Sequence, residues 1–250
     1  MGSAGRSHDG LRSRISTNLA TWDISARWAA VLFSVPLAVV PVAVLVALTE
    51  HPWFYAMTVE DGPVEWAQVG VLLIASGTFA IIARKVWKKG IRPAATLAAM
   101  GAFAALAIAG EEISWGQRLL GLETPADLEA INEQGETTIH NIGAFATASN
   151  LVQFGAAGYG AVLPILALLP TVPARIRRSH LLPPIALTSF FFGPFLYWAA
   201  RIPVEPWRAL RRASEITEAS FYAGLALFAW FILRRLNAQR DLGERPEDSQ

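Results

Sequence analysis

The residues of this chain best suited to chemistry lie between positions 110 and 141. Two adjacent carboxylates, Glu111 and Glu112, follow directly on an apolar stretch of small residues. Carboxylates at the end of a membrane span are costly unless they pair or line a polar cavity. Further on, Glu136 and His140 stand four residues apart, so on a helix they would share one face and could converge on one ion or proton. These residue types suit general acid–base catalysis or the binding of a divalent metal.

Each of these residues also has an interpretation without catalysis. Glu111 and Glu112 fall near the carboxyl end of a helix, where the helix dipole disfavours acids, so we favour a functional or tightly paired role for both. A single Glu-x-x-x-His spacing is a weak motif, and a hydrogen-bonded interfacial histidine is the alternative for His140. The polar and aromatic neighbours that could bind a substrate beside these acids are Trp115, Gln117, Arg118 and Asn141.

Composition places the chain among multi-pass membrane proteins. Hydrophobic residues make up 53% and charged residues only 16%, the mean hydropathy is +0.37, and the apolar residues are gathered into long blocks. Without cysteine, any metal would need carboxylate and histidine ligands, which suit Mg, Mn, Ca or non-haem iron. The sequence has no P-loop, dinucleotide fingerprint, nucleophile elbow or zinc-protease motif. Its basic residues lie mostly at the ends of apolar segments, so we expect no nucleic-acid binding.

The apolar segments predict an all-α fold, a polytopic bundle of about six transmembrane helices with short interfacial helices. The spans are expected at about 26–49, 63–83, 93–112, 150–169, 183–200 and 215–234. They form one transmembrane domain, 26–235, between disordered tails at 1–25 and 236–250. Residues 124–135 are expected to form a short helix with Thr124 as its N-cap, and 136–149 a half-polar helix leading into the fourth span. Small residues in the third span, and glycines 155, 158 and 160 in the fourth, predict close helix packing.

The distribution of charge predicts the orientation of the chain. Of the 21 Lys and Arg residues, 16 fall on the side that holds both termini and 5 on the other. By the positive-inside rule both termini face the cytoplasm of a cell-membrane protein. Most acids, and all the polar motifs above, then face the extracytoplasmic side.

On that side, four helix ends carry polar groups. Besides the two motifs above, acids precede the second span and open the sixth, and basic residues lie before the sixth span. Helix-dipole complementation or ordinary solvation also accounts for acids at helix starts. The basic residues either bridge to the acids, which we favour, or bind a lipid phosphate. The acids concerned are Glu60, Asp61, Glu65, Glu215 and Glu218, and the basic residues are Arg208, Arg211 and Arg212.

Three stretches of sequence, EDGPVEW from position 60, GEEISWGQR from 110 and GETTIHN from 135, resemble motifs of a group of uncharacterised bacterial multi-pass membrane proteins. The resemblance covers residues 58–142. It implies that one site contains Glu111, Glu112, Trp115, Gln117, Arg118, Glu136, His140 and Asn141, and it implies no activity. Membrane hydrolases related to alkaline ceramidases need several intramembrane histidines for zinc. Only His140 is suitably placed here, so that match fails.

Three classes of function fit these observations. The first is an enzyme on the outer face that acts on a lipid or lipid-linked substrate. Its catalytic residues would be Glu111, Glu112, Glu136 and His140, and the ligands of a divalent metal would be these four with Glu215 and Glu218. The second, ranked close to it, is a non-catalytic subunit whose acidic face binds a partner or cations. The third is a proton- or cation-coupled carrier, ranked last because the middles of the spans lack charge.

Overall fold

The computed structural model describes residues 10–49, 51–132, 137–139, 142–201 and 208–243, with the backbone alone for 118, 144, 146, 201, 208–211 and 240–243. Across these residues the secondary structure is helical, apart from one isolated antiparallel bridge between Asn132 and Ile142. The longer helices are α2 (Ala26–Leu48), α4 (Pro63–Lys88), α5 (Arg92–Glu112), α8 (Gly143–Leu166), α10 (Thr188–Arg201) and α11 (Arg208–Gly243). The shorter ones are α1 (Leu11–Thr21), α3 (Pro52–Thr58), α6 (Gln117–Leu120), α7 (Ala126–Glu129) and α9 (Ala174–Arg177), with 3-10 turns η1 (Ser114–Gly116) and η2 (Ile185–Leu187).

The predicted all-α class is confirmed, and among the residues that the structure describes four segments are long and apolar enough to cross a membrane. These are Ala26–Leu48, Pro52–Lys88, Arg92–Glu112 and Arg212–Gln239. Ile185–Ala200 is a shorter apolar segment, and α10 itself has only 14 residues, fewer than the ~20 that a bilayer needs. The structure therefore supports four spans by length and composition, and the count of six stays a prediction.

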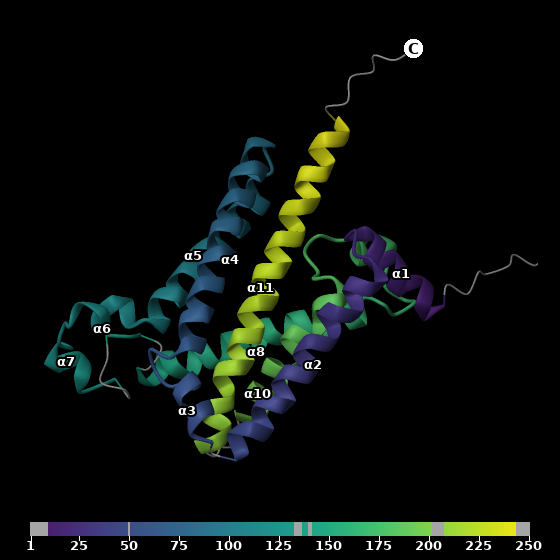
Figure 1. Cartoon of the computed structure of the whole chain (residues 1–250). Helices are drawn as coiled ribbons and strands as arrows, with labels where there is room; N and C mark the ends of the chain where they lie inside the picture. The colour runs from purple at the N-terminus through teal and green to yellow at the C-terminus, as the bar shows by residue number, and fades with distance from the viewer. Residues whose placement is uncertain (1–9, 50, 133–136, 140–141, 202–207, 244–250) are drawn as a thin grey trace, which may run out of the picture.

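The long helix α11 is the central element of the bundle (Figure 1). α4 and α5 form an antiparallel hairpin, α4 packs against α11, and α2 and α10 pack against other parts of α11. α8 packs on α10. Side chains from these helices share one core, which includes Leu72 of α4, Ala105 of α5, Ala157 of α8, Phe191 of α10 and Tyr222 of α11. This packing carries the ends of three helices, α4, α5 and α11, to a common region.

Several boundaries differ from the sequence prediction. Part of the expected tail 1–25 forms α1, because its polar Asn18 accepts a hydrogen bond from Ile185 N at 3.0 Å and Trp22 is buried against α11. The expected loop before α4 contains α3, which Pro52 and the His51 cap begin. α11 extends beyond the predicted 215–234 at both ends. Tertiary contacts, which hydropathy does not register, stabilise these additional turns.

α4 begins at Pro63, the residue predicted to start the second span. Gly62 is the N-cap and Pro63 is the first helical residue, and the Glu65 carboxylate accepts from Asp61 N at 2.5 Å. A Cβ on Gly62 would lie 2.5 Å from the Val59 carbonyl oxygen, so only glycine fits this turn.

Two of the three glycines predicted to pack closely do so. A Cβ at Gly158 would lie 3.1 Å from the Phe195 ring, and a Cβ at Gly160 would overlap the Phe191 ring. A Cβ at Gly155 would meet nothing within 4 Å. The α8–α10 contact therefore depends on Gly158 and Gly160.

We predict that Gly160→Ala destabilises the protein by about 1–3 kcal/mol, because the methyl group must displace the buried Phe191 ring. Gly155→Ala is the matched control and should be neutral or stabilising by up to about 1 kcal/mol through helix propensity. Thermal unfolding of both variants in detergent checks this. Equal melting temperatures would contradict the close packing of α8 on α10.

Candidate functional site

A hydrogen bond joins the end of α5 to the middle of α11. The hydroxyl of Tyr222 donates to Glu112 Oε1 at 2.8 Å, and Tyr222 is only 1% exposed. A buried carboxyl group needs such a donor, because desolvation without a partner is costly. Glu112, predicted from the sequence as catalytic, is therefore positioned by a residue 110 positions further along the chain.

The first turns of α4 supply two more buried polar side chains. Glu65 is 7% exposed and Gln68 is 1% exposed. Gln68 Nε2 donates to the backbone carbonyl of Glu215 at 2.6 Å, which links α4 to α11. Among the residues that the structure describes, Gln68 Oε1 has no hydrogen-bond partner. It is a buried acceptor beside a group of acids.

The carboxyl groups from these three helix ends lie close enough to interact electrostatically. Glu112 interacts in this way with three other carboxyl groups, those of Glu65, Glu111 and Glu215. Tyr222 interacts with Glu218, which lies one helical turn before it on α11. We name this group the acid cluster and define it as Glu65, Gln68, Glu112, Glu215, Glu218 and Tyr222. The structure thus brings together the starts of α4 and α11 and the end of α5, three of the four helix ends predicted to converge.

Glu111 has a different environment from its neighbour Glu112. Its Oε1 accepts from Trp115 Nε1 at 2.6 Å, and its Oε2 accepts from Ile139 N at 2.7 Å. Trp115 adopts a left-handed backbone conformation, φ 53°, and its ring covers Gly110 so closely that a Cβ there would lie 2.8 Å from the ring. Both carboxylate oxygens of Glu111 therefore hold the segment that follows α5, and we assign Glu111 a positioning role.

Gln117 also holds this segment together. Its Oε1 accepts from Thr137 N at 2.9 Å and from the Thr137 hydroxyl at 2.6 Å, and its Nε2 donates to Thr124 Oγ1 at 2.5 Å. Thr124 was predicted to cap a helix over 124–135, but the helix α7 covers only Ala126–Glu129. The Thr124 hydroxyl instead serves Gln117, because side-chain hydrogen bonds compete with helix formation.

Of the residues predicted for the fourth helix end, Glu136, His140 and Asn141 lie outside the described residues. Residues 137–139 between them are not helical, and α8 begins only at Gly143. The prediction of a helix over 136–149 is therefore wrong for residues 137–139 and agrees with α8 from Gly143 onward. The local reason is that the Thr138 carbonyl accepts from the Asn132 side chain at 2.7 Å, because such side-chain hydrogen bonds compete with helix formation.

Only one of the predicted basic residues has a described side chain. Arg212 donates to the Thr58 carbonyl at 3.0 Å and to the Tyr55 hydroxyl at 3.3 Å, and its guanidinium lies 4.5 Å from the centre of the Tyr55 ring. It also interacts electrostatically with Glu215. Arg212 therefore ties α11 to α3 beside the acid cluster. Arg118, Arg208 and Arg211 are placed by their backbones, on α6 and the first turn of α11.

The metal ligand set predicted from the sequence is not assembled among the described residues. Within that part of the chain, no three His, Cys, Asp or Glu residues are arranged to hold a metal ion. The set also includes Glu136 and His140, whose positions are outside it.

Two members of the acid cluster were not predicted from the sequence. Gln68 follows Glu65 by three residues and Tyr222 follows Glu218 by four, so each shares a helix face with a predicted acid. That spacing was a usable signal. No signal in the sequence indicates that Tyr222 pairs with Glu112, because that pairing depends on how α5 and α11 pack.

Comparisons of the chain with protein-family models, with curated proteins and with solved structures found no match. The geometry of the acid cluster is therefore the basis for any functional conclusion.

We predict that Glu111→Gln exposes the segment after α5 to proteolysis, because its new amide would place a donor against the N–H groups of Trp115 or Ile139. Glu112→Gln is the matched control, since Glu112 bonds to Tyr222 and not to this segment. Limited proteolysis with mass mapping should show cleavage within 114–142 rising several-fold in Glu111→Gln alone. Equal cleavage in the two variants would remove the distinction between these neighbours.

Proposed function

We propose that the protein is an integral protein of the cell membrane with cytoplasmic termini, whose acid cluster is an extracytoplasmic centre for acid–base chemistry on a lipid or lipid-linked substrate. The observation that carries the proposal is the hydrogen bond between Glu112 and Tyr222 amid three further carboxyl groups. Grouped, partly buried carboxyls can exchange protons with a bound substrate, as in many hydrolytic enzymes. The predicted excess of basic residues on the terminal side supports the orientation.

The roles of individual residues follow from their contacts. Glu112 is the proposed proton donor or acceptor, and Tyr222 fixes the orientation of its carboxyl group. The free Oε1 of Gln68 is suited to accept a hydrogen bond from a substrate hydroxyl or amine. Arg212 is already engaged by α3, so Arg208 and Arg211, one turn or less before it, are the proposed binders of a substrate phosphate.

We propose a divalent metal as the cofactor of the acid cluster. Carboxylate and amide oxygens are ligands that Mg, Mn and Ca prefer. Glu112 and Glu215 would hold the ion from the described helices, with Glu136 and His140 as the further predicted ligands. The metal ion would polarise a phosphoryl or carbonyl oxygen of the substrate.

The first prediction from this proposal concerns turnover. Protein reconstituted into liposomes made from total lipids of its host should change the lipid composition with time, as measured by mass spectrometry. Glu112→Gln should reduce this rate about 100-fold or more, because it removes the proton-transferring group. Tyr222→Phe should reduce it less, because the carboxyl group persists.

The matched control is Glu123→Gln, an exposed acid outside the cluster, which should keep the wild-type rate. Equal rates in wild type and Glu112→Gln would overturn the catalytic role of Glu112. If neither changes any lipid while a protein partner copurifies with wild type and is lost from Glu112→Gln, the non-catalytic subunit replaces the enzyme as the explanation.

The second prediction concerns the metal. Elemental analysis of purified wild type should show a near-stoichiometric divalent metal that is lost from a Glu112→Ala/His140→Ala double variant. Absence of metal from wild type would exclude the metal-assisted form of the proposal and leave the metal-free acid–base form.

A further inference from the structure

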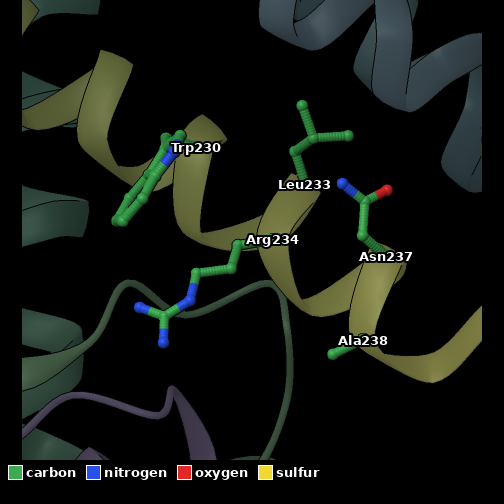
Figure 2. A pocket seen from close by; sticks show the side chains of 5 residues that line it. All are labelled: Trp230, Leu233, Arg234, Asn237 and Ala238. Atoms are coloured by element: carbon green, nitrogen blue, oxygen red, sulfur yellow. The ribbon is translucent and has the colours of Figure 1, made fainter. Parts of the chain in front are cut away.

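A second group of polar side chains lies on α11, far from the acid cluster. Twelve residues separate Tyr222 from Arg234, which is ~18 Å along a helix. Here α11 carries a surface hollow of about 380 Å³, lined by Trp230, Leu233, Arg234, Asn237 and Ala238. Their spacing places all five on one helix face. Figure 2 shows them along the helix, with the Arg234 guanidinium reaching away from α11 toward a neighbouring loop.

The wall of the hollow combines apolar and hydrogen-bonding groups. Trp230 is 47% exposed, and the Arg234 guanidinium lies 5.6 Å from the centre of its ring. Leu233 adds an aliphatic surface, while Arg234 and Asn237 add donors. A ligand that fits this lining has an anionic head and an apolar body.

The positive charge here exceeds the negative charge that pairs with it. Arg234 forms an ion pair with Asp23, whose side chain is 86% exposed, in the turn between α1 and α2. The next residue, Arg235, lies 5.5 Å from the centre of the Trp22 ring. Its Nη1 is buried and has no hydrogen-bond partner among the described residues. One carboxylate is thus paired with Arg234, while Arg235, which does not line the hollow, adds a second positive charge one residue further along α11.

His180, whose ring lies against Trp22, adds little positive charge to this region. Burial lowers the pKa of His180, and the positive charge of Arg235 lowers it further. His180 is therefore neutral at pH 7 and does not compete with Arg235 for an anion. The two arginines supply the attraction.

The position along the chain suits a membrane surface. The exposed Trp230 is of the residue type enriched where a membrane meets water. The positive-inside distribution predicts that this end of α11 faces the cytoplasm, where anionic lipids attract arginine.

We propose that the hollow at the carboxyl-terminal half of α11 binds the phosphate head of an anionic phospholipid. Arg234 and Asn237 hold the phosphate oxygens, the charge of the neighbouring Arg235 adds long-range attraction, and Trp230 and Leu233 contact the acyl chain. The inference does not depend on the reaction proposed for the acid cluster, because the two sites share no residue.

Native mass spectrometry of the full chain in detergent tests the proposal, with phosphatidylglycerol, phosphatidylcholine and inorganic phosphate as separate probes. Wild type should bind phosphatidylglycerol about tenfold or more tightly than phosphatidylcholine. Arg234→Gln/Arg235→Gln should lose about 25-fold in affinity for phosphatidylglycerol, roughly fivefold for each arginine. The matched control, Lys88→Gln/Lys89→Gln, removes two exposed charges from the end of α4 and should stay within about twofold of wild type.

The variant Asp23→Asn supplies a test in which affinity for phosphatidylglycerol should rise, not fall. Asn tolerates the left-handed backbone of this position, φ 51°, and the change frees Arg234 from its ion pair. Affinity for phosphatidylglycerol should rise about threefold or more. An equal loss in both double variants would overturn the proposal in favour of general surface attraction. Inorganic phosphate binding as tightly as phosphatidylglycerol would overturn it in favour of a free-phosphate site.

Discussion

The bundle depends on how it accommodates carboxyl groups at the ends of apolar helices. Such groups lose hydration when helices pack, and each then needs a hydrogen-bond donor or a charged partner. Glu112 obtains one from Tyr222, and Glu65 obtains one from the backbone at the start of its own helix. Because Tyr222 belongs to α11, satisfying Glu112 also fixes where the end of α5 lies against the central helix. The same hydrogen bond therefore builds the polar site and positions α5 against α11 in the bundle.

The two neighbouring acids of the motif divide this task. Glu112 faces the core and joins α5 to α11, whereas Glu111 accepts from Trp115 and Ile139 and holds the segment beyond the helix. A one-residue step along a helix turns a side chain by about 100°, so adjacent residues must face different surroundings. The motif thus couples a half-buried acid to the folding of the polar segment that follows α5. This coupling explains why acids and aromatic residues follow one another so closely there.

The central helix presents different chemistry at its two ends. Its first half carries acids and meets the start of α4 and the end of α5. Its later turns carry arginines and tryptophan and meet the turn between α1 and α2. In the proposed orientation, the acidic end of α11 lies on the extracytoplasmic side of the membrane. The basic end lies on the cytoplasmic side, where anionic lipids attract arginine. The proposed reaction centre and the proposed lipid site correspond to these two ends.

The sequence by itself determined the helical class, the extents of α2 and α5, the start of α4, and the identity of the four acids in the cluster. These features follow from local properties: hydropathy over twenty residues, turn-forming glycine and proline, and helical spacing. The tertiary structure alone decided that Glu112 bonds to Tyr222, that Gln68 faces Glu215, and that Glu111 and Gln117 serve the following segment. It also left residues 137–139, near the start of an expected helix, non-helical, so that α8 begins only at Gly143. Those outcomes depend on partners far away in the chain, and a local pattern does not encode which helices will pack together.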